Sequence, residues 1–251
     1  MSEQYRTNLD FSRLVAECDR LFNSGDASGV EKLLLTGLKK AEDFKDKHLQ
    51  LFILSELMGH YRMQGKTGES LWAVERGLQL LSELPQLDAV SAGTILINAG
   101  TALSAANEFD KALEIYRQAE QHYNGVLNKN DYLWAGLLNN MASAYLAKAD
   151  FASAENCYLQ ALDILKSLEK FTDCAVSCIN LAQVYAAQNQ QEPLISVMLE
   201  SAMEFLNAPE LPRDGYYAHT CKKCAPSFAA FNRHDIAHEL ELRAKEIYER
   251  H

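Results

Sequence analysis

The chain has 251 residues, of which 48% are hydrophobic and 23% are charged, and its 34 acidic and 24 basic residues give a formal net charge of -10. This composition is typical of a globular protein, and 12 glycines and 5 prolines are too few for a turn-rich all-β architecture or a low-complexity linker. The negative charge repels phosphate backbones, so nucleic acid is not expected as a partner.

Secretion and membrane insertion are not expected either. Residues 1–10 lack the apolar segment of a secretory signal, and no apolar run approaches the roughly 20 residues that span a bilayer. We therefore expect a cytoplasmic protein with no membrane partner.

Similar residues recur along the whole chain with a period of about 41. One column contains only small residues: Gly37, Gly77, Ala119, Ala161, Ala202 and Ala244. A second contains large apolar residues: Leu21, Tyr61, Leu103, Tyr145, Tyr185 and Phe228. A third lies three residues before the second: Cys18, Met58, Gly100, Ala142, Ala182 and Ala225. Columns that stay parallel over six units indicate a repeat protein.

The spacing within each unit is helical. In the fourth unit one apolar stripe consists of Leu138, Met141, Ala142 and Tyr145, at positions i, i+3, i+4 and i+7. A short turn over 147–150 follows, and Asp150 is placed to cap a second helix by accepting backbone N–H bonds. Each unit is therefore predicted to be a helical hairpin.

One hairpin is too small to bury its own apolar stripe, so the hairpins must stack on one another. The sequence predicts a single all-α domain over 1–251, built as an α-solenoid of about six hairpins. The predicted units cover about 8–47, 48–88, 89–130, 131–172, 173–211 and 212–251.

Residues 98–120 and 139–162 resemble tetratricopeptide repeats, and the spacing near 42 resembles the long-repeat branch that includes kinesin light chains and peptide-sensing receptors of Gram-positive bacteria. The resemblance implies a right-handed superhelix in which the first helix of each unit lines a concave groove that binds protein or peptide. Three positions depart from the pattern: Glu17 replaces an apolar residue, and Pro193 and Pro226 lie inside expected helices.

Three consecutive units carry asparagine at one position, Asn98, Asn140 and Asn180. Asparagine is a mediocre helix residue, so its recurrence calls for a compensating role. A carboxamide can pair with both the N–H and the C=O of an extended peptide, and the resemblance implies such a peptide clamp. Two other roles stay open: the amides bridge neighbouring helices, or they lie solvated in an empty groove.

Four neighbouring positions, Asn139, Thr101, Ser143 and Gln183, are expected to contact the same peptide. Together with the three asparagines they make the centre of the expected groove polar and uncharged. The sequence therefore predicts a largely neutral segment, bound in an extended conformation.

Two clusters resemble metal or redox sites. Cys221 and Cys224 form one Cys-x-x-Cys pair, but both lie at core positions of the repeat and no second pair completes four ligands. His234 and His238 lack the glutamate base of a zinc protease, so we expect two solvated histidines. No metal and no cofactor are predicted.

No phosphate-binding glycine loop and no nucleophile elbow occur in the sequence, so an enzyme is not expected. We expect an adaptor that binds an extended segment of a protein partner. A sensor of a small signalling peptide and a self-associating scaffold are the alternatives.

Overall fold

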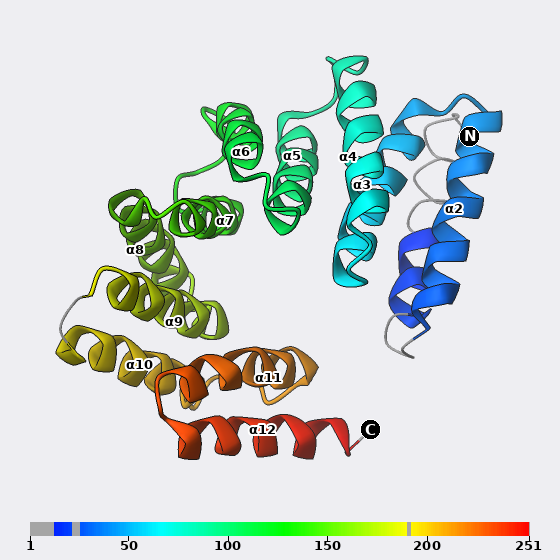
Figure 1. Cartoon of the computed structure of the whole chain (residues 1–251). Coiled ribbons are helices and arrows are strands. Elements are labelled where there is room, and N and C mark those ends of the chain that lie inside the picture. Colours follow the sequence, from blue (N-terminus) through cyan, green and yellow to red (C-terminus); the bar gives the residue numbers. More distant parts are fainter. Residues whose placement is uncertain (1–12, 22–25, 190–191, 251) are drawn as a thin grey trace. The chain divides into compact units, whose positions relative to one another are not determined.

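The structure is a computed structural model that describes residues 13–21, 26–189 and 192–250, and within these ranges it contains helices and no strand. The helices are α2 (Ala27–Asp43), α3 (Lys47–Met63), α4 (Thr67–Ser82), α5 (Ala89–Ala105), α6 (Phe109–Tyr123), α7 (Tyr132–Ala147), α8 (Phe151–Ser167), α9 (Phe171–Ala187), α10 (Glu192–Leu206), α11 (Gly215–Ala230) and α12 (His234–Tyr248). Residues 13–21 are helical as well (Figure 1). None of the described helices is long and apolar enough to cross a bilayer.

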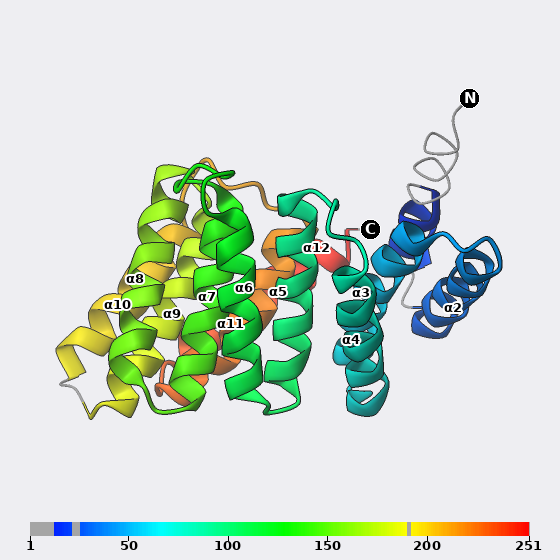
Figure 2. The same cartoon turned by 90° about the horizontal axis from the view of Figure 1, so that it is seen from above.

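Consecutive helices pack as hairpins, α3 with α4, α5 with α6, α7 with α8, α9 with α10 and α11 with α12 (Figures 1 and 2). The prediction of an all-α repeat architecture is confirmed. The described residues divide into two compact units, one ending at Leu127 and one beginning at Asn128. The single domain over 1–251 stays a prediction, and the expectations about residues 1–10 and about the start of the first repeat near residue 8 lie outside the described residues.

Aspartate side chains mark where many of the helices begin. In six helices an aspartate directly precedes the first turn, and its carboxylate accepts a backbone N–H of that turn. These aspartates are Asp26, Asp46, Asp88, Asp131, Asp150 and Asp214. The cap predicted at Asp150 is confirmed, because its Oδ1 accepts the N–H of Ser153 at 3.2 Å. Such a cap satisfies a donor that the helix cannot pair internally.

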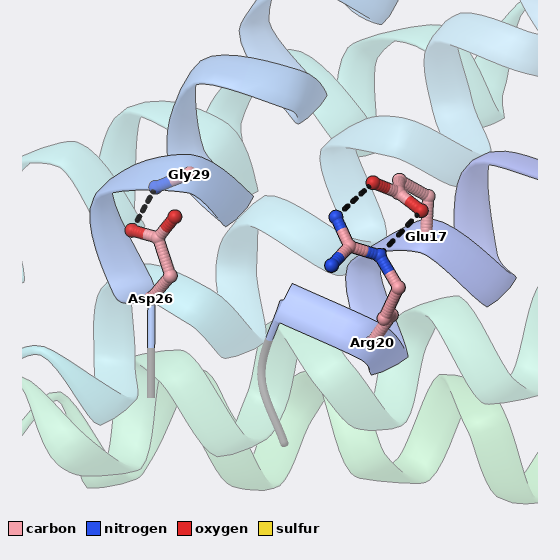
Figure 3. A network of polar contacts seen from close by, with 4 residues as sticks. All are labelled: Glu17, Arg20, Asp26 and Gly29. Atoms are coloured by element: carbon pink, nitrogen blue, oxygen red, sulfur yellow. Dashed lines mark hydrogen bonds and ion pairs between the residues drawn. The ribbon is translucent and has the colours of Figure 1, made fainter. Parts of the chain in front are cut away.

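The beginning of the chain shows how an irregular repeat is accommodated (Figure 3). Glu17, which departs from the apolar pattern, pairs with Arg20 one turn later, and the Arg20 Nε lies 2.9 Å from the Glu17 carboxylate. This ion pair lowers the pKa of Glu17. Further along, Asp26 caps α2 by accepting the N–H of Gly29 at 2.8 Å.

The turn inside each hairpin uses one left-handed residue at an equivalent position. These residues are Gly65, Asn107, Ala149, Asn189 and Asn232, with φ between 54° and 68°. In the turn that contains Ala149, the next N–H, of Asp150, donates to the Tyr145 carbonyl at 2.9 Å. The same backbone bond joins Lys66 to Tyr61, so the two turns close their first helices in the same way.

Ala149→Gly is expected to raise the free energy of unfolding by about 1 kcal/mol, because a side chain with a Cβ is strained at φ 58° and glycine is not. Urea unfolding monitored by circular dichroism measures the change. Gly65→Ala, at the same turn position of another hairpin with φ 68°, should lower it by a similar amount. Equal effects of the same sign would contradict the explanation.

The repeat columns form the core. The small column is buried at Gly77, Ala119, Ala161, Ala202 and Ala244, and Gly37 is partly buried. In the large column Tyr61, Leu103, Tyr185 and Phe228 are buried, whereas Leu21 and Tyr145 are partly exposed. Small residues let the two helices of a hairpin approach closely, and large ones fill the space between them.

Gly100 shows how tight this packing is. A Cβ at this position would overlap the ring of Tyr116, which approaches from α6. The ring cannot easily move, because the Tyr116 hydroxyl lies 3.3 Å from Thr101 Oγ1 and 3.4 Å from Ser104 Oγ. Burial of this phenol raises its pKa.

Gly100→Ala is therefore expected to destabilise the protein by about 2 kcal/mol, the usual cost of forcing extra volume into a packed core. Gly136→Ala is the matched control, because Gly136 also lies within a helix but a Cβ there meets no atom within 4 Å. That control should stabilise the protein by about 0.5–1 kcal/mol through the better helix propensity of alanine. Thermal unfolding followed by circular dichroism compares the two variants.

Candidate functional site

The seven residues predicted to contact a peptide all lie on the first helices of three consecutive hairpins, α5, α7 and α9 (Figure 1). Asn98, Asn140 and Asn180 each stand five residues before the large apolar residue that precedes the turn, so they share one register. All three are partly buried. Asn98 belongs to the first compact unit, and Asn140 and Asn180 belong to the second.

In the first unit the predicted residues bind other parts of the protein. Asn98 Nδ2 donates to Ser55 Oγ on α3 at 2.9 Å, so this amide links two first helices. Thr101 Oγ1 donates to the Ile97 carbonyl at 2.8 Å and accepts from the Tyr116 hydroxyl. Helix bridging, one of the alternatives to a peptide clamp, therefore describes Asn98.

In the second unit two of the predicted residues also bridge helices. Ser177 Oγ donates to Asn139 Oδ1 at 3.2 Å, which links α9 to α7. Gln183 Nε2 donates to Ser227 Oγ at 3.3 Å, which links α9 to α11. These bonds hold the three first helices of this unit against one another.

Asn140 and Asn180 differ from these residues, because their side chains make no hydrogen bond to any described part of the chain. Ser143, one turn after Asn139, is exposed and bonds the Tyr158 hydroxyl. Burial raises the pKa of Tyr158 to about 12, so this phenol stays neutral near pH 7. Two partly buried carboxamides with free hydrogen-bonding capacity therefore stand in register on α7 and α9.

A carboxylate that the sequence analysis missed joins all three first helices of the second unit. Asp173 accepts from the Tyr216 hydroxyl at 2.7 Å and from the Tyr132 hydroxyl at 3.4 Å. Burial, reinforced by this carboxylate, raises the pKa of both phenols. The sequence separations of 41 and 43 residues are both close to one repeat, and this could have indicated that the three side chains lie near one another.

A cavity of about 260 Å³ in the first unit was not anticipated from the sequence either. It is lined by Cys18, Asp19, Val30, Leu34, Ser55, Glu56, Gly59, His60, Met63, Gln64 and Asn98. His60 is only 9% exposed, and its Nε2 has no hydrogen-bond partner among the residues described. Burial lowers the pKa of His60.

The cysteine pair lies at the core positions that the repeat predicts, and the histidine pair is exposed as expected. Cys221 and Cys224 are buried, and burial raises the pKa of Cys224 to about 12. Both thiols are therefore poor nucleophiles near pH 7. His234 and His238 are exposed on α12. Over the described ranges, no three His, Cys, Asp or Glu side chains come together as metal ligands would.

Comparisons with known proteins agree with this geometry. A family model for the tetratricopeptide repeat matches residues 137–170. The crystal structure of BtubC (BKLC) from P. vanneervenii shares 19% identity and a TM-score of 0.54, over 99% of this chain and 92% of that one. A search of functionally curated proteins finds no match.

Two further solved structures have the same fold. A putative kinesin light chain from Podosopora anserina with nearly identical TPR-like repeats shares 17% identity and a TM-score of 0.56, over 80% of this chain and 96% of that one. The apo form of RapI shares 13% identity and a TM-score of 0.67, over 96% of this chain and 98% of that one.

The stacked helical hairpins thus define an α-solenoid repeat protein. Residues 137–170 match a tetratricopeptide repeat, and the fold of the chain is similar to that of the kinesin light chain repeats.

Asn98 makes an internal hydrogen bond and Asn140 makes none to the described residues, so alanine substitutions at the two positions should lower the free energy of unfolding by different amounts. Asn98→Ala should lower the free energy of unfolding by about 1 kcal/mol, because a bond between two helices is lost. Asn140→Ala should change it by less than about 0.5 kcal/mol, because no internal bond is lost. Urea unfolding of both variants measures this, and equal losses would show that Asn140 is structural as well.

Proposed function

We propose that the chain binds an extended peptide segment of a protein partner across the first helices of its second unit, and that Asn140 and Asn180 hold the backbone of that segment. The observation that carries the proposal is their lack of internal partners, among the described residues, at equivalent positions of adjacent repeats. Neither amide is among the buried polar atoms of the described residues that lack a partner, so both amides are accessible to solvent and can exchange water for a peptide N–H and C=O.

Spacing supports this role. First helices of neighbouring hairpins pack roughly 10 Å apart, and an extended strand advances about 3.3 Å per residue. Two asparagines in register would then meet backbone groups about three peptide residues apart. Because they contact backbone atoms, they would bind segments of varied sequence.

The polar bridges around them support preorganisation. Asn139–Ser177, Gln183–Ser227 and the Asp173 carboxylate tie α7, α9 and α11 together before any partner arrives. A surface that is already ordered loses less entropy on binding. The proposed clamp uses Ser143 as a further contact, while Asn139 and Gln183 hold the helices that carry it. Asn98 and Thr101, which are already hydrogen-bonded within the first unit, hold α5 in the same way and are not part of the proposed clamp.

The test uses linear peptides selected from a random phage-displayed library on the purified chain, with binding then measured by calorimetry. Asn140→Ala and Asn180→Ala should each weaken a selected peptide about five- to tenfold, the equivalent of about 1–1.4 kcal/mol for one or two lost hydrogen bonds. Asn156→Ala, an exposed asparagine on the second helix α8, is the matched control and should leave the affinity unchanged. Unchanged affinity in both clamp variants would refute the proposal.

Self-association is the competing outcome. Light scattering at increasing protein concentration gives the oligomeric state of the wild type and of the Asn140→Ala, Asn180→Ala double variant. A dimer that dissociates in the double variant, with no peptide selected, would assign this surface to a second copy of the chain.

A further inference from the structure

The loop that follows α6 contains the one Asn-Gly pair of the sequence, Asn124 and Gly125. Both residues are exposed, and the next residue, Val126, is 60% exposed. Tyr123, directly before the pair, is fully buried at the end of the helix. The pair therefore begins where the packed core ends, and it is in contact with water.

Two neighbouring polar groups of this loop are unpaired among the described residues. The backbone N–H of Asn124 donates to the Glu120 carbonyl at 3.0 Å, but the Asn124 carboxamide makes no hydrogen bond to a described residue. The Gly125 N–H has no acceptor among these residues either. A backbone nitrogen and the side-chain carbonyl carbon of the preceding residue are thus both accessible to each other and to solvent.

Gly125 leaves the approach to that carboxamide open. Its φ is 80°, in the left-handed region, and a Cβ at this position would meet no atom within 4 Å beyond its chain neighbours. Asn124 is extended, with φ -60° and ψ 125°. Rotation about the Asn124 Cα–C bond has to bring the Gly125 nitrogen to the side chain, and glycine tolerates the backbone angles that this rotation needs.

Two backbone hydrogen bonds oppose that rotation. The N–H groups of Val126 and Leu127 both donate to the Tyr123 carbonyl, at 3.1 and 3.0 Å. These bonds lie at a helix end next to exposed residues, where local opening costs little free energy. The turn therefore slows a reaction between the two groups without preventing it.

We propose that Asn124 is a site of spontaneous deamidation, a covalent modification that needs only water. The Gly125 nitrogen loses its proton and bonds to Cγ of Asn124, the Cγ–Nδ2 bond breaks, and Nδ2 leaves with a proton as ammonia. Water then opens the resulting five-membered succinimide. Opening at Cγ gives aspartate, and opening at the main-chain carbonyl gives isoaspartate. This proposal is independent of the proposed function.

Either product changes the end of α6. The new carboxylate lies at the C-terminal end of the helix, where the helix dipole disfavours negative charge, and Glu120 is one turn away. Isoaspartate also adds a methylene group to the main chain, so the bonds from Val126 and Leu127 to the Tyr123 carbonyl no longer fit the turn. The modification is therefore expected to loosen this helix end.

The one Asp-Gly pair of the sequence, Asp214 and Gly215, provides an internal comparison. The Asp214 carboxylate is held as the cap of α11, because its Oδ1 accepts the Tyr217 N–H at 3.0 Å. Gly215 is the first residue of that helix, so the helix fixes its backbone angles. Isoaspartate is therefore expected at Asn124 and not at Asp214 in the folded chain.

The test incubates the purified chain at mildly alkaline pH beside a synthetic peptide with the sequence of residues 120–128. Peptide mapping by mass spectrometry, with isoaspartate labelled by an isoaspartyl methyltransferase, measures both rates. Asn124 in the chain should convert about tenfold more slowly than in the peptide, the equivalent of about 1.4 kcal/mol for opening the two turn bonds. The rate should rise with pH, because the attacking nitrogen must lose its proton. An unmodified chain after the peptide has converted completely would overturn the proposal.

Two variants locate the reaction. Asn124→Gln should lose the label at this position, because the longer side chain would have to close a six-membered ring. Asn128→Gln is the matched control, since Asn128 is exposed nearby but its Oδ1 already accepts the Asn130 N–H at 3.1 Å. This control should label Asn124 at the rate of the wild type. Circular dichroism verifies that both variants fold. Label that persists in Asn124→Gln, or that appears faster at Asp214 than at Asn124, would overturn the proposal.

Discussion

The fold depends on the close approach of paired helices at positions where only glycine or alanine occurs. Gly77, Ala119 and Ala161 have almost no side chain, so the partner helix packs directly against their backbone. This constraint recurs once per repeat and forces large residues into the remaining space. Each hairpin then presents an apolar stripe that only another hairpin can cover, which is why the repeats stack.

Polar residues on the first helices perform two different tasks. Asn98, Asn139 and Gln183 join neighbouring helices, whereas Asn140 and Asn180 have no internal partner among the described residues. The bridging residues determine helix spacing, and helix spacing determines which groups of a bound segment the others can reach. In the proposed function, stability and recognition belong to adjacent positions of the same helices, and substitutions can separate them.

The sequence predicts the hairpins well because their determinants are local and repeated. Core columns, the cap at Asp150 and the burial of Cys221 follow from periodicity alone. The helix-bridging role of Asn98 could not be predicted from periodicity. It depends on a hydrogen bond to Ser55, one repeat earlier, and only the packing of α3 against α5 brings the two side chains together. The cavity beside His60 could not be predicted either, because its lining comes from residues as far apart in sequence as Cys18 and Asn98.

The shared carboxylate of Asp173 has a consequence for how the second unit opens. Repeat proteins usually fray from their ends, because a terminal repeat has one neighbour fewer. Here Tyr216 of the last hairpin and Tyr132 of the first in this unit bind the same side chain, so detachment of α11 breaks its bond to Asp173 and exposes a carboxylate shared with α7. The C-terminal hairpin is therefore joined to α9 by a polar contact in addition to the apolar stack, and its detachment leaves Asp173 with only the longer contact to Tyr132.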